Sequence, residues 1–155
     1  MDCQVMVAHA TLLMQYAQRF AGGLPYVVAG DFNVKPYDAC YKVITEGSIP
    51  DDHPQSLSNA GSAPWDPAWR PVVSPPLRSA YKDALGSEPD FTNFARTKGQ
   101  EETFCECLDY IFLSPEWIVR DVVALPASPP SGVKSFPTAQ EPSDHILIGA
   151  ELLLA

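Results

Sequence analysis

The stretch Leu-Pro-Tyr-Val-Val-Ala-Gly-Asp-Phe-Asn-Val-Lys-Pro, residues 24–36, decides the fold. Its first half is a short apolar run, rich in β-branched and aromatic residues, that follows a glycine-containing turn. This pattern predicts a buried β-strand over residues 25–30. Polar Asp31 and Asn33 follow at once, where the strand ends. The sequence therefore predicts a strand that carries a carboxylate and an amide to one end of a sheet.

Helices are predicted on both sides of this strand. Upstream, apolar residues recur at helical spacing and form one apolar stripe, which ends before Gly22 and Gly23. The residues of this stripe are Cys3, Met6, Ala10, Leu13, Ala17 and Phe20. Downstream, a short helix is predicted from Asp38 to Glu46, with Asp38 as its N-cap and Gly47 after its last turn.

The rest of the chain alternates loops with short elements. Residues 48–78 are rich in Ser, Pro, Asp, Asn and Gly and predict one long surface loop. Trp65 and Trp69 within it either pin the loop to the body of the protein or stack a nucleobase, and we favour the first. The other expected elements are helical turns at 79–86, a loop at 91–100, strands at 108–113 and 117–125, a loop at 126–142 and a closing strand at 145–154. Several strands with few helices indicate one α+β layered domain over residues 1–155.

The composition indicates an acidic globular protein. The 155 residues carry a formal net charge of −9, whereas proteins that bind long nucleic acids usually have a basic face. Either the acidic side chains gather at a cation site, or the substrate is a small phosphate ester. The sequence has neither an apolar run of membrane-spanning length nor a secretory signal pattern. With Cys105 and Cys107 interpreted as reduced thiols, we expect a cytoplasmic or nuclear protein that is not secreted and makes no membrane contact.

Polar side chains occur at the ends of three predicted strands. Asp31 and Asn33 follow the first strand, Asp109 begins a second, and Asp144 and His145 precede the last. Mg²⁺ prefers carboxylate oxygens, with water and substrate phosphate completing its shell. A histidine whose tautomer a carboxylate fixes can transfer a proton, and an amide can donate to a phosphate oxygen. Each cluster alone has a structural explanation, such as a capped turn, but together they suit phosphoester hydrolysis.

These motifs, in this order, resemble the exonuclease–endonuclease–phosphatase (DNase I-like) superfamily. The similarity includes Gly-Asp-Phe-Asn at 30–33, followed by a proline, and Ser-Asp-His at 143–145. Glu-Pro-Asp-Phe-Thr-Asn-Phe at 88–94 and Leu-Asp-Tyr-Ile at 108–111 resemble the nocturnin- and Angel-like deadenylase branch. The resemblance extends from about residue 2 to the end, with gaps at 51–76. It implies a metal-dependent phosphodiesterase with a four-layered α/β/β/α sandwich of mainly antiparallel strands.

The resemblance also implies catalytic roles. Asp31 matches the aspartate that positions or activates the attacking water near the metal. Asn33 matches the asparagine that contacts the scissile phosphate. Asp109 matches the carboxylate that orients the active-site histidine. His145 matches that histidine, which binds the phosphate and assists proton transfer.

Metal and substrate contacts are implied in the same way. Asp144 matches a carboxylate at or near the metal, so Asp144 and Asp31 are the expected ligands of Mg²⁺, or of Mn²⁺ in its place. Asn33 is expected to bind substrate, and Thr92 and Asn93 are expected to lie near the site or the substrate. The implied substrate is RNA or a nucleotide phosphate.

The sequence departs from the superfamily in one respect. The first half of that sandwich normally supplies a metal-binding glutamate, an early asparagine and a histidine in a His-Leu-type strand, and no residues here match them. We therefore expect this chain to form the C-terminal half of the sandwich, with the N-terminal half missing. Such a half-sandwich would expose an apolar face, so association with the missing half or with a second copy is expected.

The resemblance leaves alternatives for function. The leading hypothesis is an RNA 3′-exonuclease of the poly(A) deadenylase type that uses an activated water. A phosphatase acting on a small nucleotide or another phosphate ester is the alternative that the acidic charge favours. A catalytically incomplete fragment or a binding scaffold is the alternative from another class of function.

Overall fold

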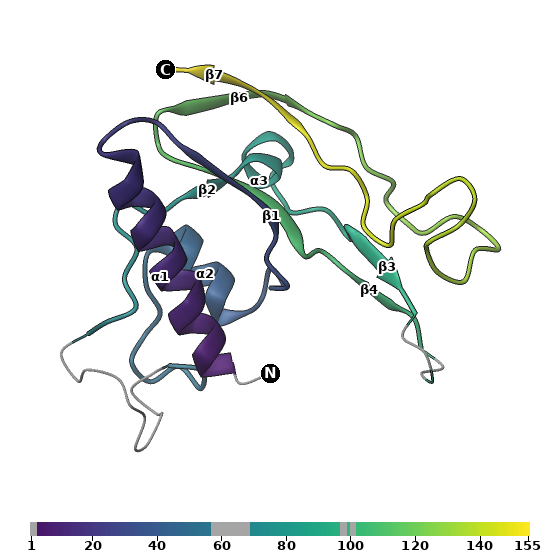
Figure 1. The fold of residues 1–155 in the computed structure, drawn as a ribbon, viewed down its shortest axis with the longest axis horizontal. Coiled ribbons are helices and arrows are strands. Elements are labelled where there is room, and N and C mark those ends of the chain that lie inside the picture. Colours follow the sequence, from purple (N-terminus) through teal and green to yellow (C-terminus); the bar gives the residue numbers. More distant parts are fainter. Residues whose placement is uncertain (1–2, 57–68, 97–98, 100–101) are drawn as a thin grey trace.

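The computed structural model describes residues 3–56, 69–96, 99 and 102–155, and it shows an α+β protein (Figure 1). Its helices are α1 (Cys3–Ala21), α2 (Ala39–Glu46) and α3 (Ala80–Leu85). Its strands are β1 (Val27–Asp31), β2 (Arg78–Ser79), β3 (Asn93–Ala95), β4 (Phe104–Glu106), β5 (Asp109–Leu113), β6 (Trp117–Val122) and β7 (Ala150–Leu154). The predicted α+β class and the helices on either side of the first strand are confirmed.

The helices begin and end near the predicted signals. Gly47 ends α2 with a left-handed φ of 91°, and its N–H donates to the carbonyl of Val43. Asp38 stands at the N-cap position, but its carboxylate accepts from the backbone N–H of Lys35 at 2.9 Å and does not cap α2. No helix in the described part of the chain combines the length and the apolar character that crossing a bilayer requires.

An antiparallel sheet with the order β1-β5-β2 lies at the centre. Val27 pairs with Leu113 at one end of the β1–β5 ladder, and Asp31 pairs with Asp109 at the other. Because the strands run in opposite directions, the last residue of β1 lies beside the first residue of β5. The register therefore brings together two carboxylates that are far apart in the sequence.

Strand β5 contributes to two separate cores. Successive side chains of a strand point to opposite faces of the sheet. Tyr110 and Phe112 pack with residues of α1 and α2, whereas Ile111 and Leu113 pack with α3, β6 and β7. All four side chains are buried, because helices cover one face and the β6–β7 ribbon, which passes above α3 in Figure 1, covers the other. This two-sided burial holds the start of β5 in place.

A smaller unit positions the C-terminal part of the site. Strands β3 and β4 form an antiparallel pair, and Asn93 in β3 makes an isolated bridge to His145. The prediction of a loop over 91–100 is wrong at β3, because distant partners stabilise this short strand. The closing strand begins at Ala150 and not at His145, since the backbone at 144–146 bonds to β3 and its neighbours instead of to β6.

The apolar stripe expected on α1 coincides only in part with its buried face, and the predicted burial of the first strand is wrong. The buried face of α1 contains Val7, Ala10, Thr11 and Met14, whereas Phe20 is 84% exposed. The apolar residues surround much of this helix, so their spacing did not single out the face that contacts α2. Strand β1 is mostly exposed and not buried, because within the described residues it pairs with β5 alone.

The predicted long loop at 48–78 is described on both of its flanks. Ile49, Val73 and Leu77 belong to the core beside α1 and α2, and residue 78 already lies in β2. Trp69 lines a shallow surface hollow together with residues of α1. Trp65 lies outside the described residues, so its role stays a prediction.

Candidate active site

The site forms where β1 ends and β5 begins. Asp31 and Asp109 are cross-strand partners, and the pairing continues one step further because the N–H of Phe32 donates to the carbonyl of Leu108 at 2.9 Å. The side chain of Asp31 is 47% exposed, whereas that of Asp109 is only 12% exposed. The two facing carboxylates therefore have different surroundings, one open to solvent and one inside the protein.

The turn after β1 holds Asp31 and Asn33 together. The Oδ1 atom of Asp31 accepts a hydrogen bond from the backbone N–H of Asn33 at 2.8 Å. Asn33 has a φ of 50°, a left-handed conformation that asparagine tolerates better than most residues. The exposed Asn33 side chain thus leaves the strand beside the exposed Asp31 carboxylate.

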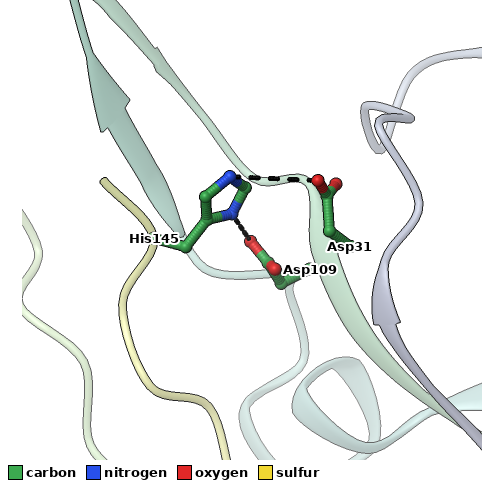
Figure 2. Close-up of side chains that lie close together, drawn as sticks. All are labelled: Asp31, Asp109 and His145. Carbon is green, nitrogen blue, oxygen red and sulfur yellow. Dashed lines mark hydrogen bonds and ion pairs between the residues drawn. The ribbon is translucent and has the colours of Figure 1, made fainter. Parts of the chain in front are cut away.

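His145 joins the two strand ends from a separate segment, as Figure 2 shows. Its Nδ1 atom lies 2.8 Å from Oδ2 of Asp109, and its Nε2 atom lies 3.8 Å from Oδ2 of Asp31. The first distance is a hydrogen bond, and the second is too long for one. Asp109 therefore orients the ring, while Nε2 is directed toward the exposed carboxylate of Asp31.

Backbone hydrogen bonds hold the segment of His145 against β3. The N–H of Phe94 donates to the carbonyl of Asp144 at 3.0 Å, and the N–H of Ile146 donates to the carbonyl of Thr92 at 2.7 Å. The hydroxyl of Ser143 accepts from the backbone N–H of His145 at 3.0 Å. These bonds fix the backbone on both sides of the histidine.

The electrostatics favour a protonated His145 ring. Burial alone lowers the pKa of His145, but the hydrogen bond and the negative charge of Asp109 oppose burial. The charges of Asp31 and Asp144 act in the same direction as that of Asp109. Together these carboxylates raise the pKa of His145 above its ordinary value of 6.5. The ring is thus able to carry a proton near neutral pH.

A family model described as the endonuclease/exonuclease/phosphatase family matches residues 7–145, which include β1, β5 and His145. The chain belongs to this family. The match confirms the resemblance inferred from the sequence motifs.

Several named proteins are similar to the chain. It is 33% identical over 132 residues to 2′,5′-phosphodiesterase 12 of Homo sapiens, with 84% of this chain and 20% of that protein covered. It is 28% identical over 139 residues to Nocturnin of Drosophila melanogaster, with 86% of this chain and 20% of that protein covered. The chain thus spans about a fifth of the length of these relatives.

Solved structures show the same fold. The human Nocturnin catalytic domain with bound sulfate superposes with a TM-score of 0.58 at 24% identity, covering 97% of this chain and 42% of that one. An endonuclease/exonuclease/phosphatase from Bacteroides vulgatus superposes with a TM-score of 0.55 at 25% identity, covering 44% of that chain. The predicted DNase I-like α+β fold is confirmed, and this chain matches less than half of each domain.

The family's chemistry generally uses a divalent metal, and the donor atoms here suit one. Asp31, Asp109 and His145 each offer a ligand atom within 4.8 Å of the others. However, Asp109 Oδ2 and His145 Nδ1 are occupied by their mutual hydrogen bond. The exposed carboxylate of Asp31 is the open oxygen donor, and one or two carboxylates with water and phosphate satisfy Mg²⁺. The side chain of Asp144 is not in this cluster, so its assignment as a ligand stays a prediction.

Thr92 and Asn93 were predicted to lie near the site or the substrate. Thr92 is completely buried and Asn93 is 4% exposed. The Thr92 hydroxyl lies 2.6 Å from Oδ2 of Asp109, which places this residue behind the carboxylate. A direct substrate contact by either residue stays a prediction.

Sequence reasoning did not single out Tyr110 and Ser143. The hydroxyl of Tyr110 lies 2.8 Å from the carbonyl of Val34 and 3.0 Å from that of Cys107. It therefore links the two backbone segments that carry Asp31 and Asp109. The position of Tyr110 directly after Asp109 was the available signal, but a tyrosine in a strand is usually interpreted as a packing residue.

Proposed function

We propose that this chain takes part in metal-dependent phosphodiester hydrolysis, most like that of an RNA 3′-exonuclease of the poly(A) deadenylase type. The observation that carries the proposal is the convergence of Asp31 and His145, with Nε2 and Oδ2 3.8 Å apart and the ring held by Asp109. An exposed carboxylate beside an oriented imidazole suits the proton transfers that accompany attack of water on phosphorus.

Each residue has a defined part in this proposal. Asp109 holds the His145 ring, and His145 exchanges a proton with the phosphate or the attacking water through Nε2. Asn33 binds a phosphate oxygen through its amide, which adds no negative charge. Asp31, together with Asp144, would hold Mg²⁺ or Mn²⁺. The bound ion would neutralise phosphate charge and lower the pKa of water.

The names of the relatives support the substrate class. The chain is similar to 2′,5′-phosphodiesterase 12. It is also 31% identical over 137 residues to the CCR4-Not complex 3′-5′-exoribonuclease subunit Ccr4 of Phaeosphaeria nodorum. Both names describe cleavage of a phosphodiester or an RNA chain. An RNA or nucleotide phosphate substrate is therefore the proposed partner, and the 3′,5′ or 2′,5′ linkage is the first variable to test.

Two alternative functions have observations in their favour. The formal net charge of −9 favours a small phosphate ester over a long strand, because an acidic surface repels an extended polyanion. A catalytically incomplete fragment or a binding scaffold is the alternative of another class, because no residue here matches the metal-binding glutamate that the family's first half normally supplies. The proposal includes association with a facing half of the sandwich or with a second copy of the chain.

Hydrolysis assays with the purified chain test the proposal. Substrates are 3′,5′-linked oligo(A), 2′,5′-linked oligo(A) and a phosphorylated dinucleotide, each with Mg²⁺ or Mn²⁺ added. Asp31→Ala and His145→Ala are expected to lose about 10²- to 10⁴-fold in turnover while staying folded. His9→Ala and Asp121→Ala are matched controls, since exposed His9 lies on α1 and Asp121 lies on β6.

The outcomes separate the alternatives. Release of single nucleotides from the 3′ end of oligo(A) supports the exonuclease proposal. Release of phosphate from the dinucleotide alone supports the phosphatase. Turnover that both site variants retain refutes the site assignment, and binding of oligo(A) without turnover supports the scaffold.

A further inference from the structure

The side chain of Thr92 makes hydrogen bonds to which the proposed function assigns no role. Its hydroxyl lies 2.9 Å from the backbone N of Leu108, 3.0 Å from the backbone N of Asp109 and 2.6 Å from Oδ2 of Asp109. The residue is completely buried. The hydroxyl is therefore surrounded by groups of β5 and of the two residues before it, Cys107 and Leu108, and not by solvent.

The direction of each of these hydrogen bonds follows from the chemistry of the groups. A threonine hydroxyl has one proton to donate and two lone pairs that accept, whereas a backbone N–H only donates. The N–H groups of Leu108 and Asp109 therefore fill both acceptor positions of Thr92. Its single proton remains for Oδ2 of Asp109. That oxygen has to act as an acceptor.

The same oxygen contacts the catalytic histidine. Oδ2 of Asp109 lies 2.8 Å from Nδ1 of His145. Because this oxygen is an acceptor, Nδ1 has to carry the proton of the neutral ring. The lone pair is then on Nε2, which is the atom directed toward Asp31. The carboxylate thus sets the tautomer that leaves Nε2 able to accept a proton, and the hydroxyl of Thr92 holds Oδ2 in the position from which it does so.

The backbone of Thr92 also fixes the segment of the histidine. Its carbonyl accepts from the N–H of Ile146 at 2.7 Å, and its own N–H donates to the carbonyl of Glu106 at 3.0 Å. One residue therefore holds the Asp109 carboxylate with its side chain and the neighbour of His145 with its main chain. A shift of Thr92 would move both partners of the 2.8 Å hydrogen bond.

We propose that Thr92 is a positioning residue, which holds Oδ2 of Asp109 against Nδ1 of His145 and so maintains the Nδ1-protonated tautomer of the ring. Its role in turnover rests on the proposed hydrolytic function, but its effect on the tautomer does not. A purely structural alternative is that the hydroxyl only accepts hydrogen bonds from the two buried N–H groups of Leu108 and Asp109. That alternative predicts a loss of stability without a change at His145.

The experiment uses three variants of the chain. Thr92→Val keeps the shape and removes the hydroxyl, and Thr92→Ser keeps the hydroxyl and removes a methyl group. Thr11→Val is the matched control, because Thr11 is equally buried and its hydroxyl bonds to Val7 within α1. Long-range ¹H–¹⁵N spectra of the ¹⁵N-labelled chain, without added metal and above the pKa of His145, report which ring nitrogen carries the proton.

The expected result is specific to the hydroxyl. The wild-type protein, Thr92→Ser and Thr11→Val show His145 protonated on Nδ1. Thr92→Val shows a large fraction protonated on Nε2, because its Asp109 carboxylate is no longer held against Nδ1. In an active preparation, Thr92→Val lowers kcat about 10- to 100-fold with little change in KM, as for other groups that orient a catalytic histidine. Thr92→Ser recovers most of the kcat that Thr92→Val loses.

Several results would overturn the proposal. One is a folded Thr92→Val protein whose His145 keeps the wild-type tautomer, and another is the Nε2-protonated form in Thr92→Ser. If Thr92→Val does not fold, Thr92→Cys takes its place, because a thiol of similar size donates weakly. An unchanged tautomer there would also refute the idea. Absence of turnover in the wild-type chain would count against the proposed function alone, since the NMR result needs no activity.

Discussion

Replacement of Tyr110 by phenylalanine tests how the two halves of the site are joined. The Tyr110 hydroxyl has one proton and two candidate acceptors, the carbonyls of Val34 at 2.8 Å and of Cys107 at 3.0 Å. Val34 follows the Asp31 turn, and Cys107 precedes Asp109. Burial, as the largest cause, raises the pKa of Tyr110, so the hydroxyl stays protonated and able to donate.

The magnitude follows from what Tyr110→Phe removes and what it keeps. The ring stacks on Phe112 with centroids 5.1 Å apart, and phenylalanine preserves that contact. The change is therefore confined to the hydroxyl and to the carbonyls of Val34 and Cys107 that lose it as a donor. Tyr110 is only 1% exposed, so water does not readily replace the hydroxyl. Loss of a buried hydrogen-bonding partner costs about 1–3 kcal/mol in the free energy of unfolding. For a chain of this size, the midpoint of thermal unfolding falls by roughly 2–4 °C per kcal/mol.

Urea unfolding followed by far-ultraviolet circular dichroism measures this loss, and two other tyrosines serve as controls. Tyr37→Phe removes a hydroxyl from a residue that is 62% exposed, so its cost is expected to stay within about 0.5 kcal/mol. Tyr81→Phe removes a buried hydroxyl that donates to Val123, away from the site. Tyr81→Phe should lower stability as Tyr110→Phe does, but only Tyr110→Phe should also shift the NMR signals of Asp31 and Asp109. Equal urea midpoints for Tyr110→Phe and Tyr37→Phe would refute the reasoning.

Further predictions concern charge and metal at and near the site. Asp109→Asn lowers the pKa of His145 in an NMR titration of the metal-free chain, because the ring loses its hydrogen-bonded carboxylate. Since that pKa is raised on folding, the protonated ring stabilises the fold below 6.5 and the contribution disappears as the pH rises through the folded value. Asp109→Asn should therefore destabilise the protein more at about pH 5 than at about pH 9, and the opposite order would contradict the assignment. Burial raises the pKa of Glu88, which accepts from the Tyr41 hydroxyl at 2.6 Å. Above pH 4.5 the folded state then binds more protons than the unfolded state, so wild-type stability falls as the pH rises through the folded pKa. Glu88→Gln should consequently gain stability relative to wild type between about pH 4 and pH 7 in urea unfolding, and a pH-independent difference would exclude this effect. Asp31→Asn should weaken Mg²⁺ binding in calorimetry, whereas Asp121→Asn should leave it unchanged.

The sequence was most informative where local pattern and chemistry coincide. The strand before Asp31, the helix ended by Gly47 and the strand that begins at Asp109 have short-range signals, and the structure contains each of them. Their order also identified the family, which the comparison over residues 7–145 confirms. The polar clusters at strand ends were predicted from the residues themselves, and their catalytic roles from the family resemblance. The antiparallel register gives the meeting of Asp31 and Asp109 a physical basis.

Features that depend on distant contacts could not be predicted in the same way. Strand β3 exists because β4 and the His145 segment pair with it, so residues 91–100 alone resemble a loop. The apolar residues of α1 fit more than one helical face, and only the position of α2 selects the buried one. The role of Thr92 arises from a contact with Asp109, 17 residues away, that no motif encodes.

The alternation along β5 has a consequence for protein engineering. Asp109 faces Asp31, while the next four residues fill cores on alternate sides of the sheet. Deleting or inserting one residue within this strand would exchange the side chains of the two cores and, in the same step, move Asp109 out of line with Asp31. A library of insertions and deletions in β5 that is screened only for soluble expression would therefore retain variants that keep Asp109 in line with Asp31. Selection for folding at β5 is also selection for the geometry of the site.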